Sequence, residues 1–307
     1  MREEAVLTRV LTETLINEIV KALGLPSTHR VRRIIASLTG RAIRRFAGLA
    51  SDLDCVIERE GLAGGARWLL PRFVKGHFAQ GVENIPPTGP LVIASNHPAS
   101  IDSVLISAYV PRRDYKVIIG EIPFFENLPN IKKNAIFAPG PTDPIGRMQV
   151  IRDVIRHLRN DGAILIFPRG GIEPDPAWMP DPASEFDHWS RSLEIFLKHV
   201  PHTQVLVTIV SGVISKAAMR HPITWFRNAR PDRQRLAFMY QMIRQMAAGT
   251  EVFGLTPRLT FGDLVSAENT TDREHMLQTI TRSAHSVLRA HMGPTLSHAA
   301  SDRRSQV

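Results

Sequence analysis

Apolar residues near the start of the chain recur at three- and four-residue steps, which is the spacing of one helix face. This first stripe consists of Val6, Leu7, Val10, Leu11, Leu15, Ile16, Ile19, Val20 and Leu23. Gly24 and Pro26 follow it and are typical helix-ending residues. A second stripe continues the pattern from Val31 to Leu49. We therefore expect residues 1–80 to form a helical N-terminal region, with contact to a membrane as one interpretation.

The second stripe differs from the first in its polar side, which is rich in arginine. The arginines are Arg30, Arg32, Arg33, Arg41, Arg44 and Arg45. Such a helix lies on anionic lipid, or it packs on its own domain and keeps a solvated basic face, and the pattern leaves both interpretations open. A third segment, ARWLLPRFVKGHF at 66–78, is short, aromatic and basic, and is a further candidate for a membrane interface.

From about residue 85 onward, short apolar runs alternate with helical segments. The runs are LVIAS (91–95), KVIIG (116–120), AILIFP (163–168) and QVLVTIV (204–210). Short, branched and nearly uninterrupted apolar runs are typical of strands buried on both faces. Between them, an apolar stripe predicts a helix over 145–158 that Thr142 or Asp143 caps. The alternation predicts an α/β domain over 81–292, with a mostly parallel sheet flanked by helices.

Three later segments also show helical periodicity. They lie near 184–200, 232–248 and 271–291. Thr271 and Glu274 have the spacing of a capping box and would begin the last of these helices. The polar residues 293–307 are expected to form a disordered tail.

Composition narrows the classes of protein that fit. Of the 307 residues, 43% are hydrophobic and 22% are charged, which predicts a folded core rather than a disordered chain. The single cysteine, Cys55, excludes an internal disulfide and favours a reducing compartment. The start MREEAVLTRV lacks the pattern of a secretory signal, and no apolar run approaches the roughly 18 residues that span a membrane. We therefore expect a cytoplasmic protein.

The net charge of +9 points to an acidic partner. Nucleic acid, an anionic membrane and an acidic protein or substrate all fit this charge, and so does a basic surface that serves only solubility. No helix-turn-helix, zinc-finger or aromatic RNA-binding signature accompanies the arginines, so nucleic acid is not the expected partner. Peripheral attachment to the inner face of the membrane fits both the charge and the lack of a spanning segment.

The sharpest chemical feature is SNHPASIDS, at 95–103, directly after a strand-like run. The ligand sites of α/β sheets lie at such strand ends. On one continuous helix, His97 and Asp102 would point roughly 140° apart, because each residue turns the helix by about 100°. A turn at Pro98 and a helix capped by Ser100 would instead let Asp102 fold back onto the imidazole. An ionised aspartate on one ring nitrogen leaves the other nitrogen free to act as a base.

The sequence gives little support for a side-chain nucleophile or for a metal site. The G-x-S-x-G element of serine hydrolases is absent, and Cys55 lies in the helical region without a nucleophile signature. The histidines outside the motif show no metal-ligand spacing; they include His77, His157, His188, His199 and His202. A His–Asp pair without a nearby nucleophile suits direct activation of a substrate hydroxyl. We expect neither a metal nor a bound cofactor.

A second feature, IFPRGGIEP at 166–174, also follows a strand-like run. The glycines Gly170 and Gly171 allow the backbone to approach a ligand closely, and their N–H groups can hold an anion or a developing oxyanion. The guanidinium of Arg169 can pair with a phosphate in a fork geometry. A plain turn with a solvent-exposed arginine is the alternative.

Together these motifs resemble those of the glycerolipid acyltransferase superfamily, which contains lysophosphatidic acid and glycerol-3-phosphate acyltransferases. NHPASID resembles the family's N-H-x-x-x-x-D motif, and FPRGGIEP stands where the family carries F-P-E-G-T-R-S. The resemblance covers roughly 80–215. It implies that His97 takes the proton of an acceptor hydroxyl while Asp102 orients His97. The hydroxyl oxygen would then attack the thioester of acyl-CoA or acyl-acyl carrier protein.

The resemblance also implies an acceptor and a set of substrate-binding residues. The acceptor is a glycerophospholipid precursor such as lysophosphatidic acid or glycerol-3-phosphate. The substrate-binding residues are Asn96, Ser100, Arg147, Phe167, Pro168, Arg169, Gly170 and Gly171.

Several positions depart from the family pattern, and they leave the acceptor open. Arg169 stands where the family has Glu, Gly171 where it has Thr, and Ile172 where it has Arg. An intermediate motif of the family places a phosphate-contacting Arg where this chain has Gly140, and Arg147 or Arg169 would have to replace it. The alternatives are another lyso-lipid or amino-lipid acceptor, or an inactive lipid-binding module of the same fold.

Overall fold

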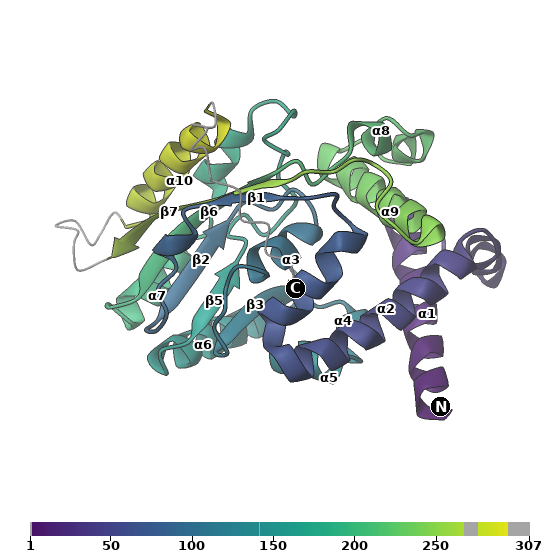
Figure 1. The fold of residues 1–307 in the computed structure, drawn as a ribbon, viewed down its shortest axis with the longest axis horizontal. Helices are drawn as coiled ribbons and strands as arrows, with labels where there is room; N and C mark the ends of the chain where they lie inside the picture. The colour runs from purple at the N-terminus through teal and green to yellow at the C-terminus, as the bar shows by residue number, and fades with distance from the viewer. Residues whose placement is uncertain (1, 141, 267–275, 294–307) are drawn as a thin grey trace, which may run out of the picture.

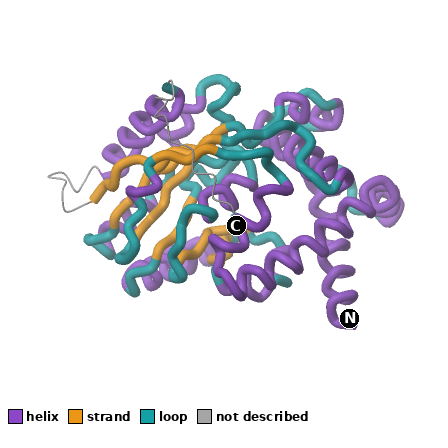
Figure 2. Tube along the Cα trace, in the orientation of Figure 1, coloured by secondary structure: helices purple, strands orange, loops and turns teal. Residues whose placement is uncertain are grey.

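The protein is a helix-flanked sheet with a helical region on one side, as the computed structural model shows for residues 2–140, 142–266 and 276–293 (Figure 1). The predicted α/β class, the mostly parallel sheet and the N-terminal helical segment are confirmed. The strands lie together in one layer, and the helices surround them (Figure 2).

Seven strands and ten α-helices are described in these residues. The strands are β1 (Phe78–Gln80), β2 (Leu91–Ser95), β3 (Tyr115–Gly120), β4 (Ala135–Ala138), β5 (Ala163–Ile166), β6 (Gln204–Ser211) and β7 (Arg258–Ser266). The α-helices are α1 (Arg2–Leu23), α2 (His29–Leu69), α3 (Ile101–Ser107), α4 (Pro123–Glu126), α5 (Pro129–Lys133), α6 (Pro144–Arg159), α7 (Ser192–His199), α8 (Lys216–Met219), α9 (Arg230–Ala248) and α10 (Met276–Met292). Four short 3₁₀ turns are η1 (Leu70–Arg72), η2 (Val82–Asn84), η3 (Pro182–His188) and η4 (Pro222–Phe226).

The strands are arranged in the order β1-β7-β6-β2-β5-β3-β4. The five from β6 to β4 are parallel to one another, whereas β7 runs antiparallel to β6 and β1 is parallel to β7. The central strands β2 and β5 are neighbours, with Ala94 paired to Ile166 near their carboxyl ends. The two motif-bearing loops that follow these strands therefore leave the same edge of the sheet side by side.

Alternate residues of each central strand pack against different helices, which explains the nearly all-apolar runs. In β2, Leu91 and Ile93 belong to a core shared with α2, α3 and α9. Val92 and Ala94 belong to a second core shared with α6, α7 and α10. Because both faces are covered, polar residues are excluded from both sides of these strands.

The first two predicted helices are present, but the second is longer than expected. It continues from His29 to Leu69 and bends at Gly61, where the backbone leaves helical geometry at φ 74°. Side chains of the segment 66–78, such as Leu70 and Phe73, are buried in the core of the sheet domain. Most apolar residues of this segment therefore pack inside the protein, although Phe78 is exposed, and its suggested role as a membrane interface stays a prediction.

Other differences from the sequence pattern follow from local geometry. The helix expected near 184–200 is split into η3 and α7, which are separated by an extended residue, Trp189. Strand β7 was not anticipated, because its outer half is exposed and has no continuous apolar run. The described part of α10 begins at Met276, so the capping box of Thr271 and Glu274, like the tail from residue 294, lies outside the described residues.

The buried side chain of His291 is expected to make the fold less stable in mild acid. His291 of α10 contacts the hydroxyls of Thr260, at 2.8 Å from Nδ1, and Ser211, at 2.7 Å from Nε2. Burial lowers its pKa to about 4, with a smaller contribution from Arg258. An unfolded chain takes up a proton near pH 6.5, whereas the folded protein resists doing so until about pH 4. We therefore expect the free energy of unfolding to fall by about 3 kcal/mol between these pH values through His291 alone.

The measurement is urea unfolding of the protein and of His291→Gln at pH 7.5, 6 and 5. The difference between the two isolates this residue from other titrating groups. It should shrink as the pH falls, since the variant has lost the acid-sensitive group. Parallel pH dependences of the two proteins would contradict the expectation.

Candidate active site

The candidate site lies where the loops after β2 and β5 meet. The first loop carries His97 and leads into α3, and the second carries the sequence FPRGGIEP. The two are joined by the backbone N–H of Glu173, which donates to the carbonyl of His97 at 2.9 Å. The neighbouring parallel strands thus bring together motifs about 70 residues apart in the sequence.

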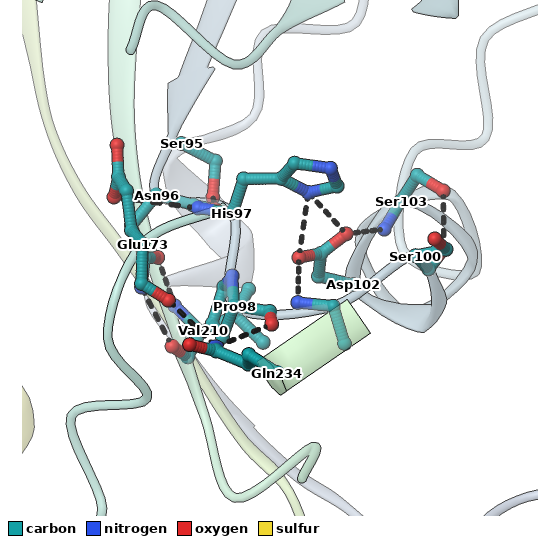
Figure 3. Close-up of polar contacts among 11 residues, drawn as sticks. Ser95, Asn96, His97, Pro98, Ser100, Asp102, Ser103, Glu173, Val210 and Gln234 are labelled. Carbon is teal, nitrogen blue, oxygen red and sulfur yellow. Dashed lines mark hydrogen bonds and ion pairs between the residues drawn. The ribbon is translucent and has the colours of Figure 1, made fainter. Parts of the chain in front are cut away.

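His97 and Asp102 face each other (Figure 3). The Nδ1 atom of His97 lies 3.0 Å from Oδ2 and 3.2 Å from Oδ1 of Asp102. The carboxylate of Asp102 is fully buried, whereas the imidazole is 24% exposed. Since the carboxylate occupies Nδ1, the proton of the neutral ring belongs on Nδ1, and Nε2 is left as the basic nitrogen.

The fold-back of Asp102 has a local cause. Its Oδ2 accepts the N–H of Ala99 at 3.0 Å, and its Oδ1 accepts the N–H of Ser103 at 2.7 Å. Three N–H donors, counting the imidazole, therefore converge on one carboxylate and fix its orientation. Ser100 precedes the helix as expected, but its side chain makes no capping bond and Asp102 takes that role. The predicted capping by the Ser100 hydroxyl is therefore wrong.

The surroundings of His97 tune its affinity for a proton. Burial lowers its pKa, but the charge and hydrogen bond of Asp102, aided by the charge of Glu173, outweigh burial and an opposing contribution from Arg235. The net effect is a pKa raised above the ordinary value. The ring also stacks on Phe167, with centroids 4.2 Å apart and planes inclined by 25°. A stacked, carboxylate-bound imidazole has a fixed orientation, as a general base requires.

Two of the expected substrate-binding residues are engaged with protein groups. The amide of Asn96 is buried and pairs with the backbone of Val210, donating at 2.9 Å and accepting at 2.8 Å. The carbonyl of Pro168 accepts the N–H of Ser190 at 3.0 Å. These contacts tie the two motif loops to β6 and to the start of α7. Substrate contact by Asn96 and Pro168 stays a prediction.

The arginines are arranged differently from the expectation. The Nε of Arg169 donates to Glu185 at 2.7 Å, and Arg230 of α9 donates to the other oxygen of Glu185, also at 2.7 Å. Arg169 is thus near the site but already paired with a carboxylate. Arg147 is exposed on the first turn of α6, after β4 at the edge of the sheet, and no hydrogen bond or ion pair joins its side chain to the site within the described residues.

The two glycines of the second motif are not equivalent. Gly170 adopts a left-handed conformation with φ 68°, which favours glycine. Its N–H donates to the carbonyl of Phe167 at 3.0 Å and is therefore occupied. The N–H of Gly171 has no protein acceptor in the part of the chain that the structure describes. Of this pair, Gly171 is the one with a backbone donor available to a ligand.

Two residues of the site escaped the sequence interpretation. Glu173 was read only as part of the second motif, yet its carboxylate is buried and accepts Nε1 of Trp189 at 3.1 Å and the N–H of His97 at 3.4 Å. Gln234 of α9 donates to the carbonyls of Pro98 and Glu173, both at 2.7 Å. Glu173 is part of the motif at 166–174, so it could have been recognised from the sequence as a residue of the site. Gln234 carries no signal, because a glutamine in a helix usually indicates a solvated surface.

The described residues contain no cluster of three or more histidine, cysteine, aspartate or glutamate side chains able to hold a metal. The chemistry that the site offers is that of a base: an oriented imidazole beside an open backbone donor.

Comparisons with known proteins give one family match and a similar solved structure. Residues 78–188 match the family model described as Acyltransferase. No curated protein sequence matches the chain. Among solved structures, the chain is similar to the 1-acyl-sn-glycerophosphate (LPA) acyltransferase PlsC from Thermotoga maritima. That similarity has 15% sequence identity and a TM-score of 0.47, and it covers 95% of this chain and 99% of the other.

Proposed function

We propose that this chain, whose residues 78–188 match the Acyltransferase family model, moves a fatty acyl group from a thioester donor to a hydroxyl of a glycerophospholipid precursor. The donor is acyl-CoA or acyl-acyl carrier protein. The acceptor is a molecule such as lysophosphatidic acid or glycerol-3-phosphate. The observation that carries the proposal is the contact between Nδ1 of His97 and the buried carboxylate of Asp102, after the carboxyl end of β2.

The proposed reaction needs no covalent enzyme intermediate. Nε2 of His97 takes the proton of the acceptor hydroxyl as the hydroxyl oxygen attacks the thioester carbonyl carbon. The carbonyl oxygen becomes an oxyanion, for which the N–H of Gly171 is a suitable donor. When the C–S bond breaks, the imidazolium returns its proton to the thiolate leaving group. Asp102 stabilises the imidazolium between these two steps.

Acyl transfer from labelled donors to a panel of acceptors tests the proposal. The panel contains glycerol-3-phosphate, lysophosphatidic acid, other lysophospholipids and amino-lipids, each offered with acyl-CoA and with acyl-acyl carrier protein. A labelled ester that depends on His97 would support acyl transfer and name both substrates. Folded protein that forms no product with any pair would favour the inactive lipid-binding module.

A second acceptor class is favoured by one specific observation. The family's phosphate-contacting arginines are replaced by Gly140 and Ile172, and the nearby Arg169 is paired with Glu185. A phosphate would have to compete with that carboxylate for Arg169. Acceptors without a phosphate, including amino-lipids, are therefore a second candidate class, and the same panel separates them from phosphate-bearing acceptors.

A basic and apolar surface supports peripheral binding to an anionic membrane. On α2, Ile34 is 58% exposed and Leu38 is 77% exposed, next to the arginines of the same helix. On η4, Trp225 is 69% exposed and Phe226 is 62% exposed. Both elements pack against one apolar cluster, which Ile223 of η4 and Ile35 of α2 contact. No helix in the described residues is long and apolar enough to cross a bilayer.

We expect the double variant Trp225→Ala/Phe226→Ala to bind anionic vesicles at least several-fold more weakly than the native protein. Exposed aromatic side chains gain free energy when they enter the interface, and arginines add an electrostatic attraction that salt screens. Flotation with anionic and with neutral vesicles, at low and high salt, measures both contributions.

The matched control is Ile145→Ala, which removes an exposed apolar side chain from α6 outside this surface. It should leave vesicle binding unchanged. Equal binding of all three proteins, or equal binding to neutral and anionic vesicles, would count against the proposed surface.

A further inference from the structure

We propose that Gln234 and Glu173 are positioning residues that hold the His97 loop in its reactive geometry. Neither side chain belongs to the His97–Asp102 pair, and Gln234 lies outside the family-matched residues 78–188. The inference rests on the proposed function only in treating His97 as the base.

Gln234 joins the two motif loops to a helix of the helical side of the molecule. It is fully buried, and its Nε2 gives its two hydrogens to the carbonyls of Pro98 and Glu173. Its Oε1 accepts from Nη1 of Arg230 at 3.0 Å, so all polar groups of the amide are used. The carbonyl of Pro98 belongs to the peptide whose N–H, on Ala99, donates to Asp102, so the bond from Gln234 acts on the turn that joins His97 to Asp102. The hydrogen bonds of Gln234 thus set the separation of the two loops.

Glu173 holds the same loop from the other side. Its backbone N–H binds the carbonyl of His97, and its carboxylate faces the N–H of His97, so the two residues are joined in both directions (Figure 3). The second carboxylate oxygen accepts from the indole of Trp189. Both oxygens therefore face N–H donors. An amide in this place could accept only one of them, because it presents one oxygen and one NH₂ group.

Few charged groups surround His97 and Glu173. His97 is influenced by Asp102, Glu173 and Arg235, and Glu173 by His97 and Glu185. Arg230 also interacts with Glu173. Burial raises the pKa of Glu173 to about 8, while the bonds from Trp189 and His97 oppose this. Glu173 is therefore close to its own titration point at neutral pH, and its charge in turn raises the pKa of His97.

The experiment compares two buried glutamines of the same helix. Gln234→Met keeps the length of the side chain and removes both donated hydrogens. Gln245→Met is the matched control: Gln245 is also buried on α9, but its Nε2 binds the carbonyl of Phe73, away from the motif loops. Both variants should lose stability, but only Gln234→Met should lower kcat. We expect a fall of at least tenfold in kcat with little change in KM, and full kcat for Gln245→Met.

A second readout does not depend on finding the substrate. The Nδ1 proton of His97, held against Asp102, gives a far-downfield proton resonance, and titration of the His97 ring by NMR gives its pKa. Gln234→Met should shift the resonance and Gln245→Met should not. Glu173→Gln should shift the resonance as well, because its amide can accept only one of the two N–H donors that the carboxylate of Glu173 faces. This readout separates failure of the positioning role from failure of the proposed reaction.

The possible results are distinct. A changed His97 resonance in Gln234→Met and in Glu173→Gln, with no change in Gln245→Met, would support the proposal. An unchanged His97 in folded Gln234→Met and Glu173→Gln, or equal loss of kcat in both glutamine variants, would overturn it. If Gln234→Met does not fold, Gln234→Asn replaces it, because the shorter amide cannot reach both carbonyls. An unaltered His97 resonance in Gln234→Asn would likewise overturn the proposal.

Discussion

Replacing His97 by glutamine is expected to slow acyl transfer by about 10²- to 10⁴-fold, the usual contribution of a positioned general base. The imidazole is partly exposed and has Asp102 as its hydrogen-bonding side-chain partner, so the substitution removes the base without opening a large cavity. Glutamine can still donate to the carboxylate of Asp102, which limits the loss of stability. The measurements are kcat with the productive substrate pair and the melting temperature of the variant.

A second histidine provides the control. His157 is partly buried and its Nε2 contacts the carbonyl of Asp114 at 2.7 Å, away from the motif loops. His157→Gln should therefore retain full activity. Undiminished turnover by folded His97→Gln would remove His97 from the mechanism and, with it, the proposed reaction.

Replacing Asp102 by asparagine is expected to cost up to about 10⁴-fold in kcat, the loss found when the carboxylate of a catalytic triad becomes an amide. Three donors converge on Asp102: the N–H groups of Ala99 and Ser103, and Nδ1 of His97. An amide offers one oxygen and two hydrogens, so its NH₂ group must face at least one donor. If it faces His97, the ring proton moves to Nε2 and the base is lost. Asp102→Glu, which keeps the charge but misplaces it, tests whether position matters beyond charge.

The pH profile distinguishes this effect from simple misfolding. Transfer requires neutral His97, so the activity of the native protein should fall as the pH drops through the raised pKa of His97. Without the attraction of Asp102, the pKa of His97 is lower. The acid limb of Asp102→Asn should therefore move to lower pH, on a lower plateau. An acid limb at an unchanged pH would show that another group controls the reaction.

How far the fold follows from the sequence depends on where each strand lies. The β2 and β5 runs were recognisable because helices cover both faces and leave only apolar positions. Strand β7 lies toward the edge of the sheet, and its residues 262–266 are partly or fully exposed, so no apolar run marks it. Sheet order is likewise absent from local periodicity, because the pairing of β6 with β7 joins residues about 50 positions apart.

The contacts of the candidate site also differ in how far the sequence predicts them. The contact of His97 with Asp102 was predictable, because a turn at Pro98 and a helix start are local features of the sequence. The cap was assigned to Ser100 because hydroxyl residues favour that position, but the Asp102 carboxylate accepts the same kind of backbone N–H more strongly. The role of Gln234 depends on how α9 crosses the loops, and no spacing within the chain encodes that crossing.

The buried core that α2 shares with the sheet limits which pieces of this protein can be exchanged between relatives. Ala66 and Leu69 of α2 pack in one cluster with Ile93 of β2 and Ala237 of α9. A chimera that transplants only the N-terminal helices would replace the α2 residues of this cluster and leave those of β2 and α9 unchanged. Helix α9 would have to be transplanted with them, although it lies about 160 residues further along the chain. A recombination breakpoint placed just before β1 would therefore divide a single packing unit, and grafts designed around the motif-bearing stretch alone should aggregate.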